Sequence, residues 1–248
     1  MRNLSWIFSN AQPTAINVLS SSRIGFPPGD QALDDPSGLL AIGGELTADW
    51  LMEAYRCGVF PWFEDDLGPI LWWCPDPRAV LPPNKLKVSR SLSKRIRNSG
   101  FQVTMDSAFE QVVHGCAGQR ATGAGTWITP QMANGYAQLH TNGYAHSVEV
   151  WDGDRIVGGL YGVSLGRMFF GESMFSLERD ASKIALYHLA RQLKVWEFNL
   201  IDCQIMNDHL SSLGAESIPR ASFLEQLEAN KLEPTRCGVW KLEHPHAG

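Results

Sequence analysis

The segment Phe169–Leu213 decides most about this chain, and it reads FFGESMFSLERDASKIALYHLARQLKVWEFNLIDCQIMNDHLSSL. Its start predicts a strand, the apolar stripe from Ala181 to Trp196 predicts a long amphipathic helix, and Asn199–Ile205 predicts a further strand. Each strand carries a carboxylate, Glu172 in the first and Asp202 in the second. Because an unpaired buried charge costs several kcal/mol, we expect each acid to be paired or to take part in chemistry.

The residues before this segment predict an antiparallel meander and further helices. HSVEVW, RIVGGLYGV and RMFFGESMF read as three strands joined by short turns. Helices are expected at Ser91–Asn98, Ser107–Cys116 and Pro130–Asn142, and another between the N-cap Thr47 and Gly58. A meander followed by a helix and a strand is the order of the N-acyltransferase superfamily, and many other α+β folds share it.

We therefore expect an α+β fold of two domains. Residues 1–80, rich in Pro, Gly and Trp, are predicted to form a small N-terminal α/β domain. Residues 81–248 are predicted to form a larger domain, with a largely antiparallel sheet flanked by helices. By analogy with the N-acyltransferase superfamily, whose element order it shares, this would be a GNAT-like catalytic domain. The pair Pro82-Pro83 is the expected boundary.

Composition indicates an ordinary globular protein. The chain has 44% hydrophobic and 19% charged residues, and its net charge of −5 argues against non-specific coating of nucleic acid. The five cysteines are odd in number and form no CxxC pair, which favours reduced thiols over disulfides or a zinc site. No signal peptide is evident, and no apolar run approaches the roughly 20 residues that span a bilayer. We expect a cytoplasmic protein with no membrane partner and no bound metal.

Glu172 is the first candidate for chemistry. Strict alternation along RMFFGESMF predicts that Phe170, Glu172 and Met174 share one face of the strand, with Gly171 and Ser173 on the other. The glycine allows a ligand to approach the backbone closely, and the methionine supplies an adaptable apolar wall. The alternative is a carboxylate at a strand edge that faces water.

Asp202 and Gln204 form the second candidate. Alternation predicts that they share one strand face, while Ile201, Cys203 and Ile205 take the other. An acid beside an amide can fix the orientation of that amide, so that its carbonyl oxygen accepts a proton-bearing group. The alternative is a structural hydrogen-bonded pair that caps a neighbouring loop. Cys203 is expected to be a core residue, not a nucleophile.

A basic stripe is the third candidate, because no acidic residue lies between Arg78 and Asp106. On a helix, Arg90, Lys94 and Arg97 fall on one face. Such a cluster in an acidic protein can contact a phosphate backbone, and a merely solvated face is the alternative. Its six members are Lys85, Lys87, Arg90, Lys94, Arg95 and Arg97.

Two of the nine tryptophans are candidates for contact with a nucleic-acid base. Trp62 and Trp127 lie in Pro- and Gly-rich loops, where an exposed indole can stack on an unpaired base, although domain packing is the commoner use.

The sequence lacks the common cofactor motifs. VGGLYG lacks the spacing of a dinucleotide fingerprint, and there is no P-loop. After the strand FFGESMF, the segment SLERDASK offers no glycine-rich turn for the pyrophosphate of CoA. No small cofactor is implied.

These motifs together resemble the bacterial leucyl/phenylalanyl-tRNA–protein transferase family. The segments that carry the resemblance run in the order of that family over nearly the whole chain, with Cys74 where Ser is expected and Glu45 where Asp is usual. The resemblance implies transfer of Leu, Phe or Met from aminoacyl-tRNA to proteins with N-terminal Arg or Lys, which marks those proteins for N-degron degradation. The segments are GLLAIGGEL, AYRCGVFPWF, ILWWCPDPRAVL, GTWITP, GYAHSVEVW, VGGLYGVSLGRMFFGESMF, ASKIAL, LIDCQ, NDHLSSLGA and IPR.

The resemblance also implies roles for individual residues. Gln204 would take or relay the proton of the attacking amine, Asp202 would orient and polarise Gln204, and Glu172 would hold an amino group of the donor or of the acceptor. The six basic residues would contact tRNA. The residues implied to bind the terminal adenosine and the aminoacyl group are Trp62, Trp127, Leu160, Phe169, Met174, Leu186, Ile201 and Asn207.

Two other functions remain open at this point. A CoA-dependent N-acetyltransferase would need a pyrophosphate-binding turn, which the sequence lacks. A non-catalytic tRNA-binding module would bind charged tRNA and leave Asp202 and Gln204 dispensable. We expect a monomer.

Overall fold

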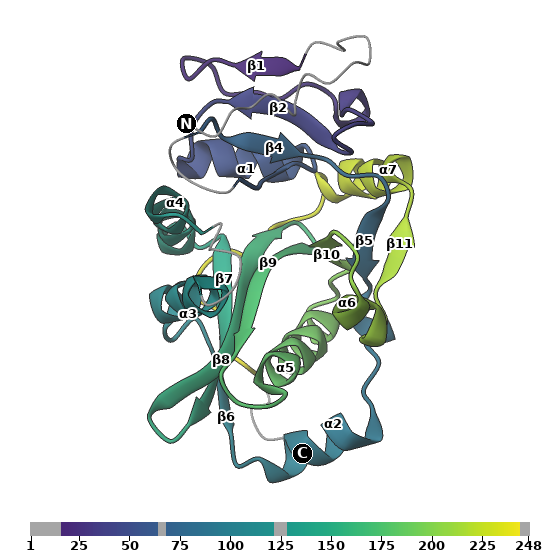
Figure 1. The fold of residues 1–248 in the computed structure, drawn as a ribbon. Helices are drawn as coiled ribbons and strands as arrows, with labels where there is room; N and C mark the ends of the chain where they lie inside the picture. Colours follow the sequence, from purple (N-terminus) through teal and green to yellow (C-terminus); the bar gives the residue numbers. More distant parts are fainter. Residues whose placement is uncertain (1–15, 64–67, 122–127, 244–248) are drawn as a thin grey trace.

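The chain folds into two sheets with helices around them. The structure, a computed structural model, describes residues 16–63, 68–121 and 128–243. The smaller sheet comes from the N-terminal part of the chain, and the larger sheet lies beneath it in the view of Figure 1. Within the described residues, no helix has the length and apolar character needed to cross a membrane.

The smaller sheet has four strands in the order β1-β2-β4-β3, and helix α1 lies next to it (Figure 1). The predicted N-cap is confirmed, because the side chain of Thr47 accepts a hydrogen bond from the Trp50 N–H at the start of α1. Gly58 has a φ of 73° just after the helix, which suits a glycine. The elements are β1 (Asn17–Leu19), β2 (Leu39–Gly43), α1 (Ala48–Arg56), β3 (Phe60–Pro61) and β4 (Leu71–Trp73), with a short 3-10 helix at Gly29–Gln31.

The larger sheet has seven strands in the order β11-β5-β10-β9-β8-β7-β6. Strands β7, β8 and β9 form the predicted antiparallel meander, and β10 runs parallel to β9 because helix α5 carries the chain back between them. The predicted α+β fold, with a meander, a helix and a strand in that order, is confirmed. The strands are β5 (Arg78–Leu81), β6 (Gln102–Met105), β7 (Ala145–Asp152), β8 (Arg155–Leu165), β9 (Met168–Ser176), β10 (Leu200–Gln204) and β11 (Glu216–Ile218).

The remaining helices include those that the sequence predicted and two that it did not. The predicted helices are present with ends that differ by a few residues, while α6, α7 and strand β11 were not foreseen. The predicted domain ranges meet between residues 80 and 81, inside β5, whereas the predicted boundary pair Pro82-Pro83 lies just after this strand. The division into two domains stays a prediction. The helices are α2 (Arg90–Asn98), α3 (Phe109–Ala121), α4 (Pro130–Thr141), α5 (Ala181–Val195), α6 (Asp208–Ser212) and α7 (Arg220–Asn230), with a 3-10 helix at Pro83–Lys85.

Two apolar cores lie on opposite faces of the larger sheet. On one face, Leu189 of α5 packs with Phe169 of β9 and Ile201 of β10. On the other face, Val112 of α3 and Phe170 of β9 belong to a core that continues into α1 and the smaller sheet. Membership of these two cores tells which face the apolar residues of β9 and β10 take.

Both central strands carry a β-bulge. On β9, the pairing with β8 passes from Tyr161 opposite Ser173 to Gly162 opposite Gly171, so Glu172 is the extra residue. On β10, the pairing with β5 skips Cys203. A bulge disturbs the alternation of side chains and turns a residue away from its regular direction. The two bulges therefore control where Glu172 and Gln204 point.

Candidate active site

A cavity of about 250 Å³ opens beside the two bulged strands. It is walled by the loop after β3, by β8, β9 and β10, and by helices α5 and α6. The structure brings together the five apolar residues that the sequence assigned to a binding pocket, and all of them line this cavity. They are Leu160, Phe169, Met174, Leu186 and Ile201.

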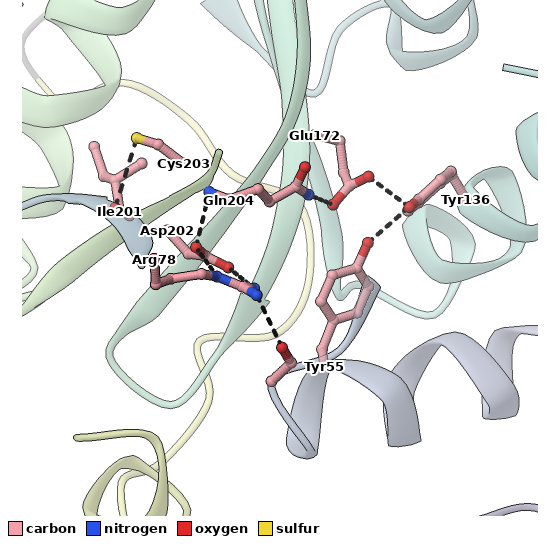
Figure 2. A network of polar contacts seen from close by, with 9 residues as sticks. Tyr55, Arg78, Tyr136, Glu172, Ile201, Asp202, Cys203 and Gln204 are labelled. Atoms are coloured by element: carbon pink, nitrogen blue, oxygen red, sulfur yellow. Dashed lines mark hydrogen bonds and ion pairs between the residues drawn. The ribbon is translucent and has the colours of Figure 1, made fainter. Parts of the chain in front are cut away.

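Glu172 lies in the wall of the cavity and is 8% exposed. One carboxylate oxygen accepts a hydrogen bond of 2.8 Å from Nε2 of Gln204, and the other accepts one of 2.6 Å from the hydroxyl of Tyr136 (Figure 2). Burial raises the pKa of Glu172 to about 7, and the hydrogen bond from Tyr136 opposes that rise. The carboxyl group can therefore change its charge near neutral pH.

Two tyrosines support Glu172 from the other side. The hydroxyl of Tyr136 in α4 lies 2.7 Å from the hydroxyl of Tyr55 in α1. Because Tyr136 donates to Glu172, Tyr55 is the donor in the bond between the tyrosines. Burial, and then the charge of Glu172, raise the pKa of both hydroxyls, so they remain protonated donors. The chain of bonds links helix α1 to the cavity.

Asp202 has a different environment from Glu172. It is fully buried, and it is not among the residues that line the cavity. Its two oxygens accept hydrogen bonds of 2.8 Å and 2.6 Å from Nε and Nη2 of Arg78, which is 1% exposed. This two-point geometry makes a strong ion pair, so the negative charge of Asp202 is matched within the protein.

Gln204 connects the two carboxylates (Figure 2). Its side chain donates to Glu172, and its backbone N–H donates to Oδ1 of Asp202 at 3.0 Å. Its φ of 62° lies in the left-handed region, which costs an ordinary residue on the order of 1–2 kcal/mol. Since the amide nitrogen bonds Glu172, the amide oxygen is the atom left to accept a hydrogen bond from a ligand.

Two expectations from strict alternation are wrong. Phe170 belongs to the core on the α3 face and Met174 packs against the core on the α5 face, so these two residues do not share a strand face. The bulge at Glu172 is the physical reason. Asp202 contacts the backbone of Gln204 rather than its side-chain amide, and Glu172 holds that amide instead.

Other predicted residues lie around the cavity as well. Trp62 is 44% exposed at its edge, where its ring meets that of Trp73 at 5.6 Å. Asn207 lines the cavity and caps α6 by accepting a bond of 2.8 Å from Leu210 N–H. Burial raises the pKa of the Cys203 thiol, which fits the expectation that it is not a nucleophile. The predicted Trp127 lies outside the described residues.

The basic residues gather on and before α2. Leu92 and Ile96 of α2 pack in the core on the α5 face. The opposite face of the helix, with Arg90, Lys94 and Arg97, is exposed as predicted. Arg95 lies over the ring of Phe101 at 4.9 Å, and Lys85 forms an ion pair of 3.0 Å with Glu216. Among the ion pairs of the described residues, none involves the other four basic residues, which are exposed. They are Lys87, Arg90, Lys94 and Arg97.

Sequence reasoning missed the residues that support the site. Arg78, Tyr55 and Tyr136 were not singled out, although each bonds a candidate catalytic group or its partner. The one available signal was Arg78 itself, a charged residue at the start of the apolar run RAVL. The tyrosines carried no signal, because their partners are distant in the sequence.

The fold and the cavity define an enzyme of mixed α/β architecture, with an apolar pocket whose wall presents an amide and a titratable carboxyl group. Residues 80–228 match the model of the leucyl/phenylalanyl-tRNA protein transferase family, and residues 44–76 match its N-terminal domain. The chain therefore belongs to the leucyl/phenylalanyl-tRNA protein transferase family.

Similar proteins agree with that assignment. A leucyl/phenylalanyl-tRNA–protein transferase of Thiobacillus denitrificans is 54% identical over 88% of this chain and 95% of its own length. One of Chromohalobacter salexigens is also 54% identical, over 90% of this chain and 86% of its own length. The structure of L-PGS from Bacillus licheniformis aligns with 70% of this chain and with 56% of its own chain. The TM-score is 0.37 and the sequence identity is 12%.

Proposed function

We propose that this chain transfers Leu, Phe or Met from aminoacyl-tRNA to the N-terminal Arg or Lys of acceptor proteins, and so marks them for N-degron degradation. Family membership supports the reaction, since the relatives are named for leucyl and phenylalanyl transfer from tRNA to protein. The missing pyrophosphate turn disfavours CoA as the donor.

The observation that carries the proposal is the amide of Gln204 in the wall of an apolar cavity, held at its nitrogen by Glu172. An aminoacyl ester is already activated, so the enzyme mainly needs to position the ester and the attacking amine. The amide oxygen can accept a hydrogen bond from that amine and direct its lone pair to the ester carbonyl.

The reaction then forms one bond and breaks another. The nitrogen of the acceptor amine bonds to the carbonyl carbon, the bond from that carbon to the ribose oxygen breaks, and the ribose oxygen gains a proton as the amine loses one. A neutral amide is too weak a base to keep this proton. The pKa of about 7 suits Glu172, next to the amide, to hold it transiently near neutral pH.

The apolar end of the cavity fits the side chain of the donor amino acid. Met174, Leu186 and Phe169 supply flexible and flat apolar surface there. A side chain that is unbranched at Cβ, such as Leu, Phe or Met, would enter, whereas the extra Cβ substituent of Val or Ile would crowd the wall.

The edge of the cavity and helix α2 fit the nucleic-acid part of the donor. Trp62, exposed at the edge, offers a ring on which the terminal adenine can stack. The exposed basic face of α2 offers charges for the phosphate backbone. We infer that Asn207, in the cavity wall, helps to hold the terminal nucleotide or the aminoacyl group.

A transfer assay tests the proposed function. The chain is incubated with labelled leucyl-tRNA and a peptide that starts with Arg, and in parallel with the same peptide starting with Ala. We expect label on the Arg peptide only. Transfer to neither peptide, or acetylation from acetyl-CoA without tRNA, would overturn the proposal. A tRNA complex without transfer would point to a binding module instead.

A further inference from the structure

Arg78 is a buried cation outside the cavity, and the proposed chemistry gives it no direct role. Its guanidinium lies between the rings of Phe60 and Phe223, at 4.9 Å and 4.4 Å from their centroids. Its Nη1 donates a hydrogen bond of 3.1 Å to the carbonyl of Gly58, just after α1. Burying such a charge is costly unless its geometry is closely satisfied, so these three contacts, together with the ion pair to Asp202, indicate a specific task.

The task that the contacts describe is to fix the carboxylate of Asp202. Nε of Arg78 donates to Oδ1 and Nη2 donates to Oδ2, so the planar fork sets both the position and the plane of the carboxylate. With Oδ1 fixed in this way, it accepts the backbone N–H of Gln204 at 3.0 Å (Figure 2).

That last bond holds Gln204 in a backbone conformation that it would not otherwise favour. Its φ of 62° follows the extra residue Cys203 of the β10 bulge. A glutamine released from this constraint would return toward φ below zero, since the left-handed region is unfavourable for side chains with a Cβ. The side chain would then leave the bond of 2.8 Å to Glu172.

We infer that Arg78 and Asp202 act as a backbone clamp, in which Arg78 is a positioning residue that acts on the reaction only through the left-handed conformation of Gln204. Asp202 serves the same clamp and does not relay protons. Gly58 and Phe60 tie the clamp to the N-terminal part of the chain. The inference rests on the proposed function for its effect on the rate, but not for the conformation itself.

A double-mutant cycle in the full chain tests the effect on the rate. Arg78→Lys keeps the cation but cannot form both bonds to Asp202, and Gln204→Ala removes the amide. We expect Arg78→Lys to lower kcat about tenfold or more with KM for leucyl-tRNA within about twofold. In the Gln204→Ala background, the same change should lower kcat by less than about twofold, because there is no amide left to position. An equal factor in both backgrounds would overturn the clamp.

Amide hydrogen exchange tests the conformation without any need for activity. The N–H of Gln204 should exchange at least about tenfold faster in Arg78→Lys than in the unchanged chain. The N–H of Val150, in the buried core of the same sheet, is the internal reference and should be unaffected. Equal exchange at Gln204 in both proteins would overturn the clamp.

Two provisions keep the test decisive. If Arg78→Lys does not fold, Asp202→Asn takes its place, because it keeps the shape of Asp202 and weakens the same pair, with the same expected outcomes. If the unchanged chain transfers no Leu at all, the proposed function fails, and the exchange of the Gln204 N–H alone then decides on the clamp.

Discussion

Strands β9 and β10 each bury a carboxylate, Glu172 at one bulge and Asp202 next to the other, and the two acids differ in nearly everything else. Glu172 faces the cavity and is held by neutral partners, the amide of Gln204 and the hydroxyl of Tyr136. Asp202 lies behind the cavity wall and is matched by the charge of Arg78. Burial alone therefore does not tell the role of an acid. Among neutral partners the pKa of Glu172 is raised, whereas the carboxylate of Asp202 is paired with a cation.

Gln204 is where the two regions meet, so its loss should have the largest effect. Gln204→Ala should lower the rate of transfer by roughly 10²–10⁴-fold, because both the orientation of the amine and the route for its proton depend on the amide. The dissociation constant for leucyl-tRNA should stay nearly unchanged. Gln102→Ala, at an exposed position of β6, is the control and should behave as the unchanged chain. A Gln204→Ala protein with near-normal turnover would remove the amide from the mechanism.

Removing each acid should separate the two regions by stability. Asp202→Ala leaves the buried Arg78 unpaired and should cost about 3–5 kcal/mol of unfolding free energy, measured by chemical denaturation at pH 8. Glu172→Gln removes a charge that burial disfavours, and should cost no more than about 1 kcal/mol there. Similar losses for both variants would contradict the difference between the sites.

The raised pKa of Glu172 should make the folded state less stable as the pH rises. Its folded pKa, about 7, lies above the ordinary value of 4.5, so between these pH values the folded state holds a proton that the unfolded state has released. The stability from this proton is full below about pH 4.5 and is lost as the pH rises through 7. The unfolding free energy of the unchanged chain should therefore be lower at pH 8 than at pH 5.5. That of Glu172→Gln should change less between the two pH values. Equal changes would contradict the raised pKa.

The α2 surface offers a contrast with both bulges, because Arg90, Lys94 and Arg97 are exposed and form no ion pair within the described residues. Replacing Arg90, Lys94 and Arg97 with Gln should reduce the slope of log affinity for tRNA against log salt by about 2 units. Transfer at saturating tRNA should be nearly unchanged. A control that replaces three exposed arginines elsewhere should keep the slope, and an unchanged slope in the α2 variant would remove this face from the tRNA contact. The control residues are Arg56, Arg155 and Arg179.

The regular elements could be predicted from the sequence, because their periodicity is intact. The stripe of α5 and the meander followed from spacing. The five apolar residues that the family resemblance implied for a pocket lie around one cavity. The predicted alternation of side chains was wrong at Glu172 and Cys203, because nothing in the neighbouring sequence indicates the β-bulges there.

Long-range partners were also beyond reach. Arg78 and Asp202 are 124 positions apart, so nothing in either neighbourhood predicts their ion pair. The sequence of the C-terminal tail did not predict any packing either. In the structure, Trp240 is buried and its ring stacks on His146, with the ring centroids 3.7 Å apart. Such contacts depend on how distant segments pack, which one sequence does not reveal.

The pH profile of transfer tests most directly the central claim that Glu172 titrates behind the amide of Gln204. Single-turnover rates with leucyl-tRNA and the Arg peptide are measured for the unchanged chain and for Glu172→Gln from pH 5.5 to 8.5. The ratio of the two rates cancels the titration of the acceptor amine. We expect this ratio to rise about tenfold per pH unit at the acidic end and to level off above pH 7. A ratio that stays constant over the whole range would contradict the claim.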